Sequence, residues 1–128
     1  MSQQRAELFI EALHALEERG DLDTLVGLYA EDATLINVNL PTPMTGTAGV
    51  RQFWKDYRSL FSEIHSTFSH VVVQGDEVAL EWTGRGKLAA NDEPIEYDGV
   101  TMLTFRDGKI AAFRGYFDQM ALTQRVEV

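Results

Sequence analysis

Four polar residues of this sequence could position a small molecule and transfer protons. Asn37, His65, His70 and Asp118 are our candidate catalytic residues. Imidazole and carboxylate groups can take up and release protons, whereas an asparagine amide can only orient a carbonyl or hydroxyl group. Simpler interpretations stay open: Asn37 can be a strand-end or turn residue, either histidine can lie on the surface, and Asp118 can cap a helix predicted over residues 119–125. These residues allow acid/base chemistry without requiring it.

We expect neither a metal nor another cofactor. The chain has no cysteine, which excludes thiolate ligands and thiol catalysis. His65 and His70 are five residues apart, so strand alternation predicts that they point to opposite faces and do not share a metal. No His-x-His pattern occurs in the sequence. One of the two histidines could still act as a general base at the mouth of a pocket.

Composition indicates one globular domain spanning residues 1–128. Hydrophobic residues make up 45% and charged residues 24%, which argues against disorder. The formal net charge of −9 disfavours nucleic acid and anionic membranes as partners, because binding to either needs clustered basic residues. No apolar run approaches the roughly 20 residues that span a bilayer. Glu7 and Glu11 interrupt the N-terminal apolar stretch, so we expect no signal peptide and a cytoplasmic protein.

Three helices are predicted in the first half of the chain. The first has apolar residues at helical spacing with glutamates, Glu17 among them, on the other side, and it ends at Gly20. Asp21 caps a short second helix that extends through Tyr29, and Thr47 caps the third. The apolar face of the third helix is formed by Val50, Phe53, Trp54, Tyr57 and Phe61. Between the last two helices we expect a strand over residues 33–38 and a proline-containing loop over 39–46.

The second half predicts four long antiparallel strands, over residues 66–74, 77–90, 95–106 and 109–118. Turn-forming pairs separate them: Gly75-Asp76, Asn91-Asp92 and Asp107-Gly108. Three helices cannot cover both faces of such a sheet. We therefore expect a strongly curved, mostly antiparallel sheet wrapped around the helices, with an apolar cavity at its open end. Charged residues of the opposite strand parity fit ion pairs on the outer face of the sheet or across a dimer interface: Glu81, Arg85, Asp98 and Arg114.

Two segments resemble a known superfamily. Residues 20–46 (GDLDTLVGLYAEDATLINVNLPTPMTG) with the helix that follows, and residues 105–122 (FRDGKIAAFRGYFDQMAL), resemble the NTF2-like superfamily and, within it, the SnoaL-like branch. Ketosteroid isomerases and limonene-epoxide hydrolases are neighbouring branches. The resemblance covers nearly the whole chain. It implies an α+β fold in which three N-terminal helices and the curved sheet form a cone-shaped barrel. It also implies a homodimer, which we expect to form through the outer face of the sheet.

Most catalytic residues of the two neighbouring branches have no counterpart in this sequence. The isomerase base, oxyanion-hole tyrosine and protonated acid correspond to Asn37, Phe9 and Thr101. The epoxide-hydrolase asparagine is retained at Asn37. The other hydrolase positions, its arginine, its two aspartates and its tyrosine, correspond to Trp82, Gly84, Gly115 and Leu35. The resemblance therefore implies neither of these two reactions in its usual form.

The resemblance and the strand parity together indicate an apolar pocket for a small molecule. Its candidate substrate-binding residues are Phe9, Phe53, Trp54, Tyr57, Trp82, Thr101, Phe113 and Phe117. The simpler interpretation, that these aromatic residues only form the core, stays open.

Two functions fit this sequence. The first is an isomerase, cyclase or hydrolase that acts by acid/base chemistry on a polyketide-, steroid- or terpenoid-like molecule without a cofactor. The second is a non-catalytic binding or accessory protein of the same fold. The missing carboxylates at Asn37, Thr101 and Gly115 favour the second.

Overall fold

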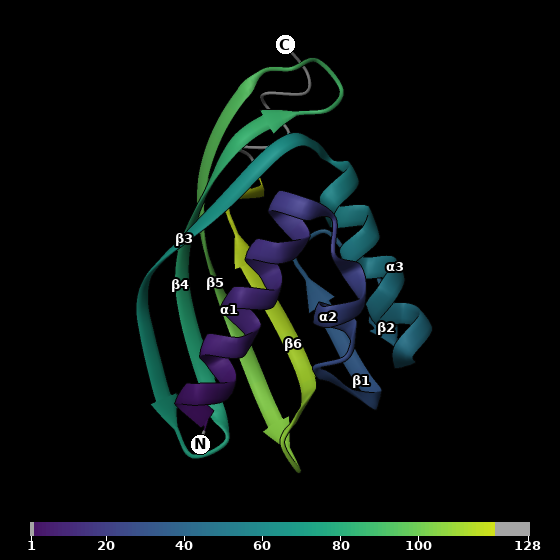
Figure 1. Cartoon of the computed structure of the whole chain (residues 1–128), viewed down its shortest axis with the longest axis vertical. Coiled ribbons are helices and arrows are strands. Elements are labelled where there is room, and N and C mark those ends of the chain that lie inside the picture. Colours follow the sequence, from purple (N-terminus) through teal and green to yellow (C-terminus); the bar gives the residue numbers. More distant parts are fainter. Residues whose placement is uncertain (1, 120–128) are drawn as a thin grey trace.

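The computed structural model describes residues 2–119 as an α+β fold in which helices pack on one strongly curved six-stranded sheet (Figure 1). The strand order is β2-β1-β6-β5-β4-β3, and all neighbours are antiparallel except the parallel pair β1 and β6. The elements are α1 (Ser2–Arg19), α2 (Leu22–Val26), β1 (Tyr29–Asn37), β2 (Met44–Thr45), α3 (Gly46–Ser59), β3 (Phe61–Gln74), β4 (Glu77–Leu88), β5 (Pro94–Arg106) and β6 (Lys109–Phe117). The predicted fold class is confirmed.

The end of α1 and the start of α2 occur at signals that the sequence carries. Gly20, with φ of +72°, ends α1, and its backbone N–H donates to the carbonyl of Leu16 over 3.0 Å. Asp21 caps α2 by accepting from the backbone N–H of Thr24 over 3.2 Å. The predicted extension of α2 through Tyr29 is wrong, because Tyr29 begins β1 and pairs with Ile110 of β6.

The segment before α3 also differs from prediction. Residues 39–46 are not only loop: Met44 and Thr45 form the short strand β2 beside β1. Thr45, rather than Thr47, occupies the N-cap position of α3. At the other end, α3 stops at Ser59, and Phe61 turns inward as the first residue of β3. The strand therefore starts five residues earlier than the predicted residue 66.

The predicted meander of long strands is confirmed, and its turns are made where the backbone is left-handed. Positive φ angles occur at Gly75 between β3 and β4, at Asp92 between β4 and β5, and at Asp107 and Gly108 between β5 and β6. Helix α1 lies across the face of the sheet and α3 lies on the β1 side (Figure 1). None of the helices in the described part of the chain is long and apolar enough to cross a membrane.

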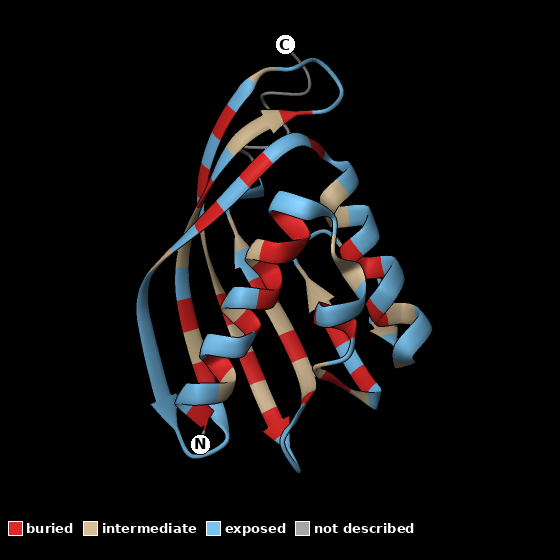
Figure 2. Cartoon of the chain, in the orientation of Figure 1, coloured by how far each residue is buried: buried red, intermediate tan, exposed pale blue. Residues whose placement is uncertain are grey.

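The main core cluster joins buried residues of the three helices and of the sheet. Figure 2 shows these buried positions along the ribbon. Phe9 of α1, Leu35 of β1, Leu80 of β4 and Leu103 of β5 are fully buried there. Burial of each such side chain contributes roughly 1.5–3 kcal/mol to stability. A second, smaller cluster lies around Tyr97 and consists of Phe61, Ile64, Leu88, Ile95 and Tyr97.

Candidate functional site

A cavity of about 310 Å³ opens between α1, α3 and the inner face of the sheet. Its walls are mostly apolar. They are formed by Phe9, Leu13, Asn37, Asn39, Leu40, Met44, Phe53, Trp54, Asp56, Tyr57, Leu60, Ser66, Trp82, Tyr97, Thr101, Phe113, Gly115 and Phe117. All eight predicted substrate-binding residues and Asn37 are among them. Their role as ligand contacts stays a prediction.

The aromatic rings of the cavity wall hold one another in place. Trp54 packs edge-on against Phe53, with ring centroids 5.0 Å apart, and against Phe113, with centroids 5.3 Å apart. On another part of the wall, Trp82 packs edge-on against Tyr97 at 5.2 Å. Edge-to-face packing at these separations is favourable. The cavity therefore has a wall whose shape is fixed before any ligand arrives.

Asn37 and Thr101 line the sheet side of the cavity, in register with Gly115 between them. Asn37 of β1 pairs with Gly115 of β6, and Gly115 pairs with Thr101 of β5. The side-chain oxygen of Asn37 accepts from the backbone N–H of Asn39 over 2.8 Å, and the hydroxyl of Thr101 accepts from the indole N–H of Trp82 over 3.0 Å. Among residues 2–119, neither the side-chain N–H groups of Asn37 nor the hydroxyl proton of Thr101 has a hydrogen-bond acceptor, so both residues can donate to a ligand.

A buried carboxylate lies behind the opposite part of the wall. Glu17 of α1 is only 2% exposed. It accepts hydrogen bonds from the hydroxyl of Tyr57 over 2.6 Å, from the hydroxyl of Ser66 over 2.6 Å and from the backbone N–H of Ser66 over 2.9 Å. Short O–H···O bonds of this kind are typical of an ionised acceptor. Because Tyr57 and Ser66 line the cavity, Glu17 connects to it through two hydroxyl groups.

The surroundings of Glu17 keep the nearby phenols protonated. Burial, and after it the charge of Glu17, raises the pKa of Tyr57 well above its ordinary value. The same two causes, in the same order, raise the pKa of Tyr97. Tyr57 is therefore a neutral hydroxyl that donates to a carboxylate.

Comparison with known families identifies the domain. Residues 9–113 match the SnoaL-like domain family. The chain belongs to this family. Three solved structures of similar fold agree with that assignment, and because each is less than 25% identical to this chain, the likeness shows the fold alone.

The structures of similar fold come from different bacteria. An NTF2-like protein of unknown function from Burkholderia pseudomallei K96243 has a TM-score of 0.87 at 18% identity, over 99% of this chain and 98% of that one. A candidate SnoaL-like polyketide cyclase from Jannaschia sp. CCS1 has a TM-score of 0.82 at 16% identity, over 95% of this chain and 93% of that one. A hypothetical protein with a ketosteroid isomerase-like fold from Catenulispora acidiphila DSM 44928, in complex with trimethylamine, has a TM-score of 0.81 at 19% identity. The match covers 94% of this chain and 92% of that one.

Three of the four predicted catalytic residues of this SnoaL-like domain lie outside the cavity wall. His70 is exposed and contacts Glu81 over 2.5 Å. His65 is exposed and stacks on His14 of α1, and Asp118 follows β6. The helix that Asp118 is predicted to cap, over residues 119–125, lies outside the described residues except for Gln119. The alternation used to place the two histidines is interrupted, because the register of β3 against β4 shifts between Phe68 and His70.

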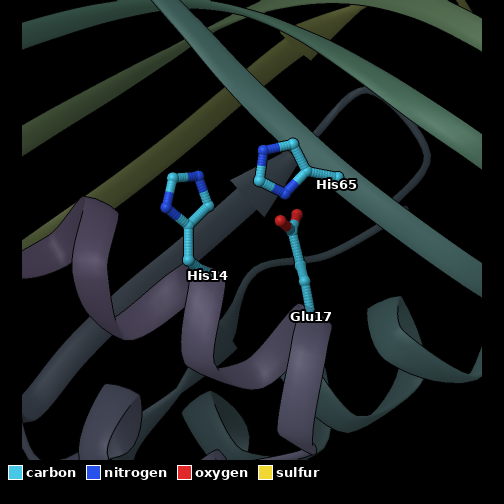
Figure 3. A group of neighbouring side chains, drawn as sticks. All are labelled: His14, Glu17 and His65. Carbon is cyan, nitrogen blue, oxygen red and sulfur yellow. The ribbon is translucent and has the colours of Figure 1, made fainter.

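His14, Glu17 and His65 form a cluster beside the cavity, shown in Figure 3. Their potential ligand atoms lie within 4.8 Å of one another. The two imidazole rings are stacked, with centroids 4.8 Å apart and planes 15° apart, so their in-plane lone pairs do not converge on one point. One ring nitrogen of His14 lies 2.8 Å from the carbonyl of Ser66. The arrangement is therefore not a preformed metal site.

Among the residues that our sequence analysis did not place at the site, four matter most for its chemistry. Glu17, Ser66 and Tyr97 belong to the cavity and its hydrogen-bond network, and His14 lies beside them. The prediction that Glu17 lies on the polar side of the first helix is wrong. It is four residues after Leu13 and so shares the face that α1 buries. That spacing is the one signal in the sequence that could have identified it.

Proposed function

We propose that this SnoaL-like domain binds a small, mainly apolar ring compound in its cavity. The observation that carries the proposal is a fixed aromatic wall with a few polar groups around one cavity of about 310 Å³. Small-molecule sites usually have this form, with volumes of about 300–1,000 Å³. A volume near the lower limit favours a compact ring compound over a large polycyclic one.

The polar groups divide the cavity into two ends of different chemistry. Asn37 and Thr101 offer donors, which suit a carbonyl or ether oxygen of the ligand. Tyr57 and Ser66 direct their own protons to Glu17 and so offer acceptors. A polyketide-, terpenoid- or steroid-like fragment with one oxygen atom would satisfy the donor end. The Jannaschia protein, assigned as a candidate polyketide cyclase, and the Catenulispora protein, in complex with trimethylamine, support a small organic ligand.

A second candidate function is acid/base catalysis on the bound compound, as in an isomerase or cyclase. The contact between Tyr57 and Glu17 favours it, because it supplies the carboxylate that positions 37, 101 and 115 lack. A proton leaving the ligand could bond to the oxygen of Tyr57 while the phenol proton moves to Glu17, which leaves both groups neutral. Asn37 and Thr101 would hold the oxygen on which negative charge develops. No cofactor takes part in this scheme.

Ligand binding can be tested by titrating ring ketones and aromatic compounds against the fluorescence of Trp54 and Trp82. We expect quenching that saturates, and at least about 10-fold weaker binding for Trp82→Ala, because one wall of the cavity is removed. Tyr116→Ala is the matched control, since Tyr116 points away from the cavity and is 49% exposed. Equal affinity in Trp82→Ala and wild type would place the site elsewhere.

Catalysis can be tested by incubating the bound compounds in D₂O and measuring their mass. If the second candidate function holds, deuterium is incorporated faster than without protein, and Asn37→Ala slows it by about 100-fold through lost positioning. If compounds bind but show neither deuterium exchange nor conversion, acid/base catalysis is contradicted and only the binding function remains.

A further inference from the structure

The charge of Glu17 has no cationic partner in the described part of the chain. Its three recorded contacts are with the neutral hydroxyls of Tyr57 and Ser66 and with a backbone N–H. None of the ion pairs within residues 2–119 includes it. Buried charges in proteins are ordinarily paired, because burial removes the water that would stabilise them. A bound cation could therefore stabilise this carboxylate.

The cavity beside Glu17 has a negative character. Among the described residues, no lysine, arginine or histidine lines it, and the one ionisable group besides the tyrosines is the carboxylate of Asp56. The aromatic faces of Trp54, Tyr57 and Trp82 carry partial negative charge, which also attracts cations. An anionic ligand would be repelled by the carboxylates of Glu17 and Asp56.

The hydrogen bonds at this end restrict the ligand further. Tyr57 and Ser66 each carry one hydroxyl proton, and both donate it to Glu17. Toward the cavity, their oxygens can therefore only accept. A ligand group at this position needs N–H or O–H donors.

We propose that the ligand carries a protonated amine, which binds at the oxygens of Tyr57 and Ser66 in front of Glu17 while its apolar ring fills the aromatic part of the cavity. This inference rests on the proposed binding function and names the class of ligand. An ammonium group satisfies the acceptors with its N–H bonds and the carboxylate with its charge.

Two other cations could neutralise Glu17, and the experiment must exclude them. A divalent metal could bind Glu17 with His14 and His65 if the imidazole rings rotated, so the buffer contains EDTA. Either histidine could become protonated, so binding is measured near pH 8, above the range in which histidine side chains usually titrate.

The test compares three probes of similar shape: phenethylamine, phenethyl alcohol and hydrocinnamate, measured by calorimetry and by tryptophan fluorescence. We expect the amine to bind at least about 10-fold more tightly than the alcohol, and the acid most weakly, because a full charge close to a buried carboxylate is little screened. In Glu17→Gln the preference for the amine should fall to about 2-fold or less. The matched control is Glu18→Gln, which removes an equal charge from an exposed neighbouring position and should keep the preference.

The failures of the two proposals are distinguishable. Tighter or equal binding of the alcohol or the acid to the wild type would overturn the amine assignment and leave the apolar site intact. An amine preference that persists in Glu17→Gln would overturn it as well. If none of the probes binds, the proposed binding function fails together with the inference. Should Glu17→Gln not fold, Tyr57→Phe removes one acceptor, and the amine preference should decrease in that variant also.

Discussion

At the scale of single residues, Tyr57 links the packing of the core to the cavity. Its hydroxyl is one of two side-chain donors to Glu17. In Tyr57→Phe the buried carboxylate loses this donor, so we expect the free energy of unfolding to fall by about 1–3 kcal/mol. Urea unfolding measures it, with Tyr116→Phe on the exposed side of the sheet as the control. A loss below about 0.5 kcal/mol would mean that Glu17 finds another donor.

Two buried tyrosines, Tyr29 and Tyr97, and the partly buried Tyr57 predict how stability depends on alkaline pH. Burial raises the pKa of Tyr29, Tyr57 and Tyr97 above the ordinary value of about 10. A raised pKa means that the folded protein holds these protons more tightly than the unfolded chain. The resulting stabilisation is complete below about pH 10 and is lost as the pH rises through the raised values.

Absorbance at alkaline pH and thermal unfolding check this prediction together. We expect the melting temperature to fall above about pH 10, and the phenolate absorbance of these three tyrosines to appear only with unfolding. Phenolate absorbance of all tyrosines near pH 10, with the fold intact, would contradict the burial of their hydroxyls.

Single residues also show what the sequence could and could not indicate about the site. The aromatic wall was predictable, because large apolar residues at helical or alternating spacing face inward. Glu17 was not recognised, because a glutamate is expected at the surface unless its partners are known, and its partner Ser66 is 49 residues away. The catalytic roles of His65, His70 and Asp118 stay predictions, and the geometry places none of these residues at the cavity wall.

At the scale of elements, α1 covers part of the β3 edge of the sheet. β3 is the last strand in the sheet order, so one side of its backbone has no neighbouring strand. His14 and Glu17 bind the backbone carbonyl and N–H of Ser66 over 2.8 Å and 2.9 Å. Side chains thus satisfy groups that would otherwise attract another strand.

The pairing of β3 with β4 depends on a close approach at Gly86. A Cβ atom on Gly86 would lie 2.0 Å from the backbone carbonyl oxygen of Glu63. Gly86→Ala must therefore displace one strand, and we expect it to lower stability by about 1–3 kcal/mol, as overpacking does. The measurement is urea unfolding of the variant. Gly27→Ala is the control, because Gly27 has helical backbone angles and should tolerate alanine or gain from it. Unchanged stability of Gly86→Ala would contradict the strand spacing.

The sequence predicted which elements exist better than where they end. Gly20, Asp21 and the turn pairs act locally, so their effects could be read from neighbouring residues. Tyr29 and Phe61 were assigned to helices because their spacing fits a helical face. Each instead begins a strand, whose pairing with a distant partner (Ile110 and Leu88, respectively) outweighs the local spacing.

At the scale of the whole molecule, the helices lie on one face of the sheet, and no element within residues 2–119 covers its outer face (Figure 1). Two rows of paired residues cross the strands on this face. The first row is Val72, Ala79, Met102 and Arg114. The neighbouring row is His70, Glu81, Val100 and Tyr116. The predicted ion pairing of this face is confirmed in part, since Arg114 pairs with Glu77 and Arg85 with Glu96. The face therefore combines exposed apolar side chains with charges.

We propose that this outer face forms a homodimer. Val72, which is 62% exposed, lies in the first row, and Val100 and Tyr116 lie side by side in the second. A pairing of two such faces would cover these side chains and leave both cavities open on the inner side.

Size-exclusion chromatography with light scattering should therefore give twice the chain mass for the wild type. Val100→Asp places a charge in the middle of the face and should give a monomer, because an unpaired charge is costly to bury. Leu8→Asp, on the exposed side of α1, should stay a dimer. A monomeric wild type, or dissociation of Leu8→Asp but not of Val100→Asp, would rule out the outer face as the interface.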